Sequence, residues 1–418
     1  MVEAAPEIDT NLYSRQIGTY GLEMMGKLVK MRVLIVGMRG LGVEIAKNLI
    51  LAGPQAVTLY DPTQVSIADR GANFYIGEND VGNTTRAEAS VTQLKSLNPT
   101  VSVEVAGEFT NEMVSTFNVV VVTEMFWNSD RLIEINELCR ANRVGFILSE
   151  NLGLASYAFL DYGNEFMVTD KDGEATKQFI ISSIEQGENP TVHVHEDKRH
   201  SYQDGDYVKF IEVEGMDQIN EFPHIEIFDT KAYSFKLRLD TTGFGAYSRQ
   251  GLVEDVKVPK PVAFHSLAES RTNPAASTAY GMLEPMDMNY FGMGRSEILH
   301  LSIGAVHQFK NTENRYPGDN EEDLAKCVAF AKAINEAGKA SNGLSVDEVD
   351  EEIVKKVCAY STCSITSQAA MFGGFIAQEV VKFTGKYMPL KQWAHYDCFE
   401  SLPADAVNRE PMGCRYDD

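Results

Sequence analysis

Hydrophobic and polar positions follow two alternating periods along the first part of the chain. Short runs rich in Val, Ile and Leu predict buried parallel strands at 32–36, 56–60, 101–105, 118–123 and 144–149. Between them, apolar residues recur with helical spacing at 43–52, 84–97 and 128–142. Alternation of strand and helix is typical of a doubly wound parallel sheet. The pattern therefore predicts an α/β domain over residues 1–162.

The pattern changes after Gly163. Residues 165–258 carry short alternating runs such as EFMVTD, TVHVH and SFKLRL, separated by Gly, Asp and Asn. This spacing predicts a compact antiparallel sheet or small β-barrel inserted into the chain. From 262 to 340 the apolar spacing is helical, as in SEILHLSIGAVHQF, and predicts an all-α region.

The last part, 341–418, begins with the acidic segment SVDEVDEEIVKKVCAY. We expect Ser345 to cap a helix there, with acidic residues in its first turn. A packed helix and a strand should follow. Gly373 and Gly374 lower the helix propensity, so we expect another backbone to approach closely at that point. We also expect this part to return to the first sheet, which would make that domain discontinuous.

Composition excludes several classes of function. Lys and Arg number 37 against 60 Asp and Glu, which gives a net charge of −23 and argues against a nucleic-acid partner. We found neither a secretory signal nor an apolar run of about 18 residues, so no membrane association is expected. The six cysteines are scattered and suggest neither a disulfide framework nor a zinc site. We therefore expect a cytoplasmic or nuclear protein.

The segment RVLIVGMRGLGVEIAKNLI contains a glycine loop between a predicted strand and a predicted helix. Backbone N–H groups at Gly37, Gly40 and Gly42 could bind a phosphate at the positive end of the helix dipole. Asp61 follows the next strand, where a carboxylate could bind a ribose hydroxyl. The spacing is G-x-x-G-x-G, however, and not the dinucleotide-binding G-x-G-x-x-G. A second interpretation therefore stays open, in which the glycines serve only close packing.

Two other groups of residues could carry chemistry. His193 and His195 share one face of a predicted strand, but no third ligand is evident, so we expect a solvated strand face and no metal site. Cys363, with His395 further along the chain, could form a nucleophilic pair. No basic neighbour activates its thiol, so we expect a small buried residue instead.

The order of these segments resembles the N-terminal half of the eukaryotic ubiquitin-activating enzymes. The resemblance rests on LYSRQIGTYGLEMMGKL, VLIVGMRGLGVEIAKNLILAG, DGDYVKFIEVEGM and FGGFIAQEVVKFTGKYMPLKQW. It implies a ThiF/MoeB-type, Rossmann-like adenylation domain formed by 1–162 and 341–418. It also implies the first catalytic-cysteine half-domain at 165–258 and a four-helix bundle at 262–340. Family members pair an active with an inactive adenylation half. The full enzyme uses ATP and Mg²⁺ to adenylate the C-terminal glycine of ubiquitin and then forms a thioester.

The resemblance further implies that this chain is the inactive half. Asp61 keeps the ribose position, but the family's triphosphate-binding arginine falls on Ala72 and its Mg²⁺-binding aspartate on Trp127. The two family lysines fall on Asn83 and Thr85. Adenylation needs positive charge and metal around the phosphates, so this chain should require no cofactor of its own. Arg70 or Arg86 remains as a substitute in principle.

Arg15 is the one catalytic residue that the resemblance assigns here. It lies in LYSRQI, the family motif whose arginine reaches into the ATP site of the active half, as arginine fingers do. The alternative is a surface arginine paired with a carboxylate. The implied partners are the active adenylation half, ubiquitin and, indirectly, ubiquitin-conjugating enzymes. Family chains continue beyond CRYDD, so we expect a piece of a longer protein and, if the pairing face is exposed, a homodimer.

Three other interpretations remain. The chain could be the inactive subunit of a heterodimeric activating enzyme for another ubiquitin-like modifier, although the inserted β domain argues against it. It could be a free-standing nucleotide-binding pseudoenzyme. It could also be an NAD-dependent oxidoreductase, but the glycine spacing differs and no catalytic His or Tyr–Lys arrangement is evident.

Overall fold

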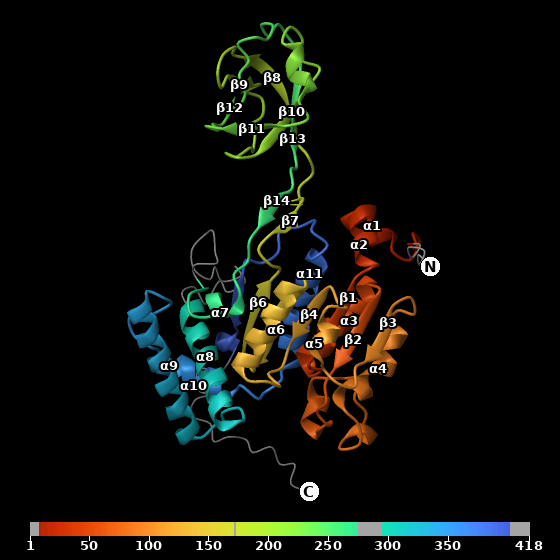
Figure 1. The fold of residues 1–418 in the computed structure, drawn as a ribbon, viewed down its shortest axis with the longest axis vertical. Helices are drawn as coiled ribbons and strands as arrows, with labels where there is room; N and C mark the ends of the chain where they lie inside the picture. The colour runs from red at the N-terminus through yellow and green to blue at the C-terminus, as the bar shows by residue number, and fades with distance from the viewer. Residues whose placement is uncertain (1–7, 171–172, 275–294, 402–418) are drawn as a thin grey trace. The chain divides into compact units, whose positions relative to one another are not determined.

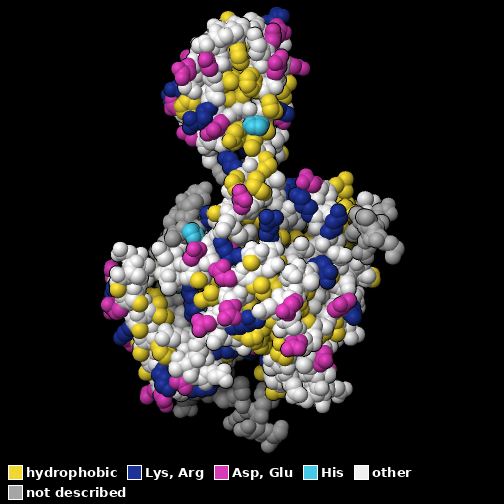
Figure 2. Space-filling model, in the orientation of Figure 1, with side chains coloured by type: hydrophobic (Ala, Val, Ile, Leu, Met, Phe, Trp, Pro, Cys, Tyr) yellow, Lys and Arg dark blue, Asp and Glu magenta, His cyan; other side chains and the backbone are white. Residues whose placement is uncertain are grey.

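The computed structural model describes residues 8–170, 173–274 and 295–401, which form two compact units. The sheet unit comprises Met1–Phe166, Val262–Thr384 and Pro389–Asp418. The barrel unit comprises Met167–Pro261 and Gly385–Met388. Figure 2 shows Asp and Glu side chains scattered over the visible face of both units, interspersed with Lys and Arg. No helix among the described residues is long and apolar enough to cross a membrane.

Within the described residues, the sheet unit is built on a seven-stranded sheet in the order β15–β6–β5–β4–β1–β2–β3 (Figure 1). Its strands are β1 (Arg32–Val36), β2 (Ala56–Tyr60), β3 (Ser102–Val105), β4 (Val119–Val122), β5 (Gly145–Leu152), β6 (Ala155–Asp161) and β15 (Trp393–Asp397). Strands β1 to β5 are parallel, whereas β6 pairs antiparallel with β5 and β15. The valines of β4 are fully buried, as expected for a central parallel strand covered on both faces.

Helices cover this sheet. Helix α3 (Gly40–Ala52) packs against α11 (Thr366–Lys382) and α4 (Arg86–Leu97), and α6 (Ser129–Ala141) packs against β5. The shorter helices are α1 (Ser14–Tyr20), α2 (Leu22–Leu28), α5 (Asn111–Val114) and α7 (Leu267–Ser270). Each predicted strand and helix of residues 1–162 is confirmed, with ends that differ by at most three residues.

Three longer helices pack on one another at the side of the sheet unit that carries α7 (Figure 1). They are α8 (Ser296–Glu313), α9 (Glu321–Ser341) and α10 (Glu351–Ala359). Their buried side chains belong to the same apolar core as β4, β5 and β6. Residues 275–294 lie outside the described part of the chain, so the four-helix bundle at 262–340 stays a prediction.

The prediction that Ser345 caps a helix is wrong. Helix α10 begins at Glu351, and the side chain of Asp350 caps it by accepting hydrogen bonds from the N–H groups of Glu352 and Ile353. The segment around Ser345 is a loop because the side chain of Asn335 binds the backbone of Val346 at both its N–H and its C=O. The acidic first turn, in contrast, is confirmed.

The return of the last part to the sheet is confirmed, because β15 extends the sheet next to β6. Close backbone approach is confirmed at Gly373, where a Cβ atom would lie 2.7 Å from the Cβ of Glu44 and 3.3 Å from its carbonyl carbon. The same expectation is wrong for Gly374, which has no neighbour within 4 Å of a Cβ position. Helix α11 therefore turns only one of its two adjacent glycines toward α3.

The barrel unit confirms the inserted β domain. Its strands close in the order β10–β11–β12–β9–β8–β13. They are β8 (Gln178–Ile184), β9 (Thr191–Val194), β10 (Tyr207–Ile211), β11 (Ile225–Phe228), β12 (Ser234–Leu237) and β13 (Leu252–Val256), with η3 (Asp217–Glu221) between β10 and β11. Alternate residues face inward and form the core, among them Val192, Val208, Ile227, Phe235 and Val253. The short strands β7 (Phe166–Val168) and β14 (Lys260–Val262) pair with each other.

Candidate functional site

The glycine loop lies at the carboxyl end of β1, between its neighbours β2 and β4. In open α/β sheets, ligands bind at such a point, where the strand order reverses. Gly37 has a φ of +101°, a backbone conformation that favours glycine, and its N–H donates to the carbonyl oxygen of Tyr60. Helix α3 then begins at Gly40. The location is thus the one expected for a nucleotide loop.

The protein itself fills the space next to the loop glycines. A Cβ atom on Gly42 would lie 1.8 Å from the carbonyl oxygen of Gly37. One on Gly40 would lie 2.8 Å from the Cβ of Ala72 and 2.9 Å from the Oγ of Ser364. Close packing is therefore sufficient to explain Gly40 and Gly42, and nucleotide binding by the loop stays a prediction.

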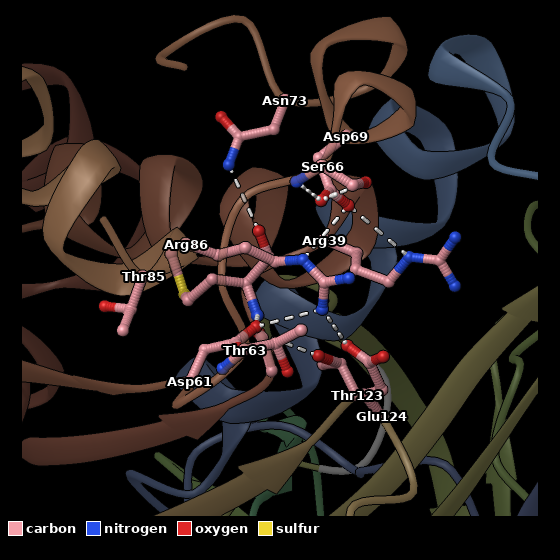
Figure 3. Close-up of polar contacts among 12 residues, drawn as sticks. Arg39, Asp61, Thr63, Ser66, Asp69, Asn73, Thr85, Arg86, Thr123 and Glu124 are labelled. Carbon is pink, nitrogen blue, oxygen red and sulfur yellow. Dashed lines mark hydrogen bonds and ion pairs between the residues drawn. The ribbon is translucent and has the colours of Figure 1, made fainter. Parts of the chain in front are cut away.

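Asp61 uses both of its carboxylate oxygens within the protein (Figure 3). It is 3% exposed. Its Oδ2 accepts a 2.8 Å hydrogen bond from the N–H of Met38, and its Oδ1 accepts a 2.9 Å bond from the N–H of Thr63. The side chain of Asn73 donates to the carbonyl oxygen of Met38. The loop amide at Met38 and the carboxylate of Asp61 thus bind each other.

Arg86 is the centre of the site. Thr85 caps helix α4 and so places Arg86 at its first position, where the side chain is 7% exposed. The guanidinium contacts three carboxylates, those of Glu124 (3.0 Å), Asp69 (3.0 Å) and Asp61 (3.5 Å) (Figure 3). Burial by itself lowers the pKa of Arg86, but the three carboxylates outweigh it and raise this pKa. The cation is therefore paired with carboxylates inside the protein.

Carboxylates and cations alternate around the loop. Burial raises the pKa of Glu124, and the charge of Arg86 only partly offsets this. For Asp69, burial also acts to raise the pKa, but hydrogen bonds from Ser66 and the charge of Arg86 outweigh it and lower the pKa. Arg39 adds a second cation 3.9 Å from Asp69. Lys310 contributes a further positive charge near Glu124, so the cations around the loop already face carboxylates of the same chain.

The space beside the loop is small. The cavity next to the loop measures about 20 Å³ and is lined by Arg39, Thr123, Glu124 and Ser364, among others. Cofactor pockets typically measure about 300–1,000 Å³, whereas this cavity has room for about one water molecule. Trp127 stacks on Tyr60 with ring centroids 6.3 Å apart, and Ala72 is 2% exposed. The side chains at these two positions therefore pack within the fold.

Arg15 lies apart from the loop, on α1. Tyr13, just before this helix, is buried, and its hydroxyl contacts the side chains of Thr100 and Asn98. A Cβ atom on Gly53 would clash with the Tyr13 ring, so the end of α3 and the start of α1 are in close contact. Arg15 is exposed, and among the described residues its guanidinium has no ion pair. The alternative of a surface arginine paired with a carboxylate thus has no support in this part of the chain.

The histidine pair and the cysteine suggested by the sequence do not form a site with the glycine loop. His193 is exposed, and His195 lies 3.0 Å from exposed Asp197. No group of metal-ligating side chains occurs among the described residues. The prediction that Cys363 is buried is wrong: it is exposed, because Arg39 binds the adjacent carbonyl of Thr362 and holds the turn at the surface.

Sequence reasoning missed a buried cluster around Glu150, on β5. The carboxylate accepts hydrogen bonds from Tyr157 (2.8 Å), Tyr316 (2.7 Å) and His307 (2.8 Å). Burial would raise the pKa of Glu150, but hydrogen bonds and the charge of His307 outweigh it and lower the pKa to about 2. The one sequence signal is a glutamate within an otherwise buried strand, and it does not reveal the partners.

The fold and the loop define an α/β protein of the nucleotide-loop type, with a barrel inserted in its chain. The chain matches the ThiF family over residues 13–410 and belongs to that family. It is 38% identical over 419 residues to ubiquitin-activating enzyme E1 1 of Triticum aestivum, covering 98% of this chain and 38% of that protein. It is 36% identical over 419 residues to ubiquitin-like modifier-activating enzyme 1 of Oryctolagus cuniculus, again covering 98% of this chain and 38% of that protein.

The chain thus spans about two fifths of the length of these curated relatives and is similar to their N-terminal region. Among solved structures, E. coli MccB with succinimide is 20% identical, with a TM-score of 0.32, covering 35% of this chain and 47% of that one.

Proposed function

We propose that this chain is the non-catalytic adenylation half of a ubiquitin-activating enzyme. In this proposal it pairs with an active adenylation half, contributes Arg15 as an arginine finger, and forms part of the surface that receives ubiquitin. ATP and Mg²⁺ act in the active half, whose product is then passed to ubiquitin-conjugating enzymes. The acidic balance of 37 cations against 60 carboxylates suits the basic character of ubiquitin.

One observation carries the proposal. The point at which a nucleotide would bind is filled by the buried contacts of Arg86 with Glu124, Asp69 and Asp61. A chain similar to ubiquitin-activating enzymes, but with carboxylates and cations of its own chain bound to one another beside the loop, is suited to act together with a second adenylation site in that reaction. The surface of α1 and its neighbours supports pairing, because Leu12, Leu22 and Leu51 are each about half exposed.

Arg15 suits a role in a partner's site. Its helix is anchored through Tyr13, while its guanidinium stays exposed. An arginine that reaches a triphosphate from outside neutralises charge that develops during transfer, and removal of such a group typically costs a factor of about 10³ or more in rate.

The test is ubiquitin-dependent exchange of pyrophosphate into ATP. We expect none with this chain alone and robust exchange once the active adenylation half is added as a separate chain. Arg15→Ala should then reduce the exchange rate by about a factor of 10³ without weakening the association of the two chains. Lys30→Ala, which removes another exposed cation, serves as the matched control and should leave the rate unchanged.

Four outcomes would contradict the proposal or favour one of its alternatives. Exchange by this chain alone would mean that its own loop binds ATP productively. An unchanged rate with Arg15→Ala would remove the arginine finger. If the mixed chains activate a different ubiquitin-like protein and not ubiquitin, the heterodimeric alternative replaces the proposal. Saturable binding of ATP or NAD by the chain alone would favour the pseudoenzyme or the oxidoreductase.

A further inference from the structure

A cavity of about 250 Å³ lies inside the sheet unit, away from the glycine loop. Its walls come from α6, β5, α8, α9 and the loop that follows α9. The lining is mainly aliphatic and includes Leu132, Leu148, Leu301, Ile303, Ile334 and Leu344. Since a water molecule accounts for about 30 Å³ of liquid, the space holds about eight non-hydrogen atoms. This size and lining are those of a site for a small apolar molecule.

Arg271 lines the same cavity, and it carries a positive charge there. Burial lowers its pKa, which reflects the loss of water around the guanidinium. Within the described residues, this guanidinium makes no hydrogen bond and no ion pair, and no Asp or Glu lines the cavity. The charges of Tyr157 and Asp130 act in its favour but do not outweigh burial. Removal of a charge from water without a counter-charge in direct contact is costly, so the arginine is a poor choice for mere packing.

The position of Arg271 is fixed through its backbone. Its N–H donates to the carbonyl oxygen of Leu267, and its own carbonyl accepts a 2.9 Å hydrogen bond from Nε2 of His300. Nδ1 of His300 in turn lies 3.2 Å from Nε2 of His395. Burial lowers the pKa of His300 to about 4, so this ring is neutral at neutral pH. Arg271 is therefore the permanent cation of the cavity wall.

We propose that this cavity binds a small apolar carboxylate, with its chain among the leucines and its carboxylate on the guanidinium of Arg271. A carboxylate matches the fork of a guanidinium with two parallel hydrogen bonds. The ligand supplies a counter-charge in direct contact with the guanidinium, which no described residue of the cavity wall provides, and its methylene groups cover the aliphatic side chains. The proposal does not depend on the adenylation role of the chain.

Hexanoate is the probe, because its six carbons and two oxygens match the volume. Isothermal titration calorimetry of the full chain at neutral pH should give a dissociation constant between about 10 µM and about 1 mM. Hexanol, which lacks the charge, should bind at least about tenfold more weakly. Acetate, which lacks four methylene groups, should bind on the order of a hundredfold more weakly. Hexylammonium should not bind.

Variants separate the roles of the charge and of the space. Arg271→Gln should weaken hexanoate binding at least about tenfold, and Arg271→Lys should retain part of it. Ala337→Phe places a ring at the exposed edge of the cavity on α9 and should block binding, whereas Arg131→Gln, at a half-buried arginine on α6 that does not line the cavity, should not change it. Circular dichroism checks that each variant is folded. The comparison of hexanoate, hexanol, acetate and hexylammonium uses the unchanged chain, so it tests the proposal even if a variant does not fold.

Absence of hexanoate binding would overturn the proposal. So would equal affinity for hexanol and hexanoate, since Arg271 would then play no part in recognition. Equal affinity of the unchanged chain and Arg271→Gln would place hexanoate elsewhere on the protein and would contradict the proposal as well.

Discussion

Replacement of Arg86 by methionine tests how the loop end of the sheet is held together. The guanidinium is buried, and it contacts the carboxylates of Glu124, Asp69 and Asp61 within 3.0–3.5 Å. Methionine has a similar length but no charge, so the variant leaves Arg39, 3.9 Å from Asp69, and the charge of Lys310 near Glu124 to offset the carboxylates. Loss of one partner of a buried ion pair typically costs about 3–5 kcal/mol, and we expect this loss in the free energy of unfolding near pH 8.

Urea denaturation followed by tryptophan fluorescence measures the free energy of unfolding of the sheet unit. Trp127 and Trp393 are the two tryptophans of the chain, and both lie in that unit. The loss should depend on pH. Without Arg86, burial raises the pKa of Glu124 in the folded state further above its unfolded value. The folded variant is therefore penalised at high pH and recovers as the pH falls and the carboxyl group takes up a proton.

Arg131→Met is the matched control, because Arg131 pairs with Glu134 on the more exposed face of α6. Surface pairs contribute about 1 kcal/mol or less, so this variant should lose little stability at any pH. A loss below about 1 kcal/mol for Arg86→Met, or a loss that does not shrink as the pH falls, would refute the view that Arg86 neutralises buried carboxylates.

Three further predictions use other parts of the chain. Gly373→Ala should lower the melting temperature through its clash with α3, whereas Gly374→Ala should leave it unchanged or raise it, by up to about 1 kcal/mol in stability, in paired thermal scans. Because the pKa of Glu150 is lowered to about 2, its stabilising contribution is complete above about pH 4.5 and is lost as the pH falls toward 2. Acid titrations should accordingly be flatter for Glu150→Gln, and an unchanged curve would contradict the assignment. A maleimide should modify exposed Cys363 in the native chain but not buried Cys139, as peptide mass spectrometry can check.

The backbone of the fold could be predicted from local pattern. Buried parallel strands are nearly continuous apolar runs, and β4 consists of valines alone. Barrel strands alternate because one side of each faces the barrel core. Both signals are contained within a few neighbouring residues, which is why the five predicted strands of residues 1–162 lie within three positions of the observed ones, whereas β6 (Ala155–Asp161) was not predicted.

The interior of the site could not be predicted in this way. Arg86 is 25 positions from Asp61 and 38 from Glu124, and only the folded sheet brings them together. The sequence suggests Arg86 only in principle, as a substitute for the family's phosphate-binding cation. In the structure it neutralises carboxylates of its own chain. The predictions for Cys363 and Ser345 were wrong for a related reason. The side chain of Arg39 holds the loop that contains Cys363, and the side chain of Asn335 holds the loop that contains Ser345.

The pairing of β15 with β6 has a consequence for the synthesis of the protein. Strand β6 ends at Asp161, and its outer neighbour ends at Asp397, so roughly two hundred residues must be translated between them. At about 5–20 residues per second, the ribosome needs roughly 10–50 s to supply that neighbour. During this interval the nascent sheet exposes an edge strand that is completely buried in the finished protein, and unpaired edges invite association with other chains. The barrel strands are contiguous in sequence and can close meanwhile. Translation of Trp393–Asp397 is therefore the step after which the nascent chain no longer presents this edge to chaperones and to other newly made proteins.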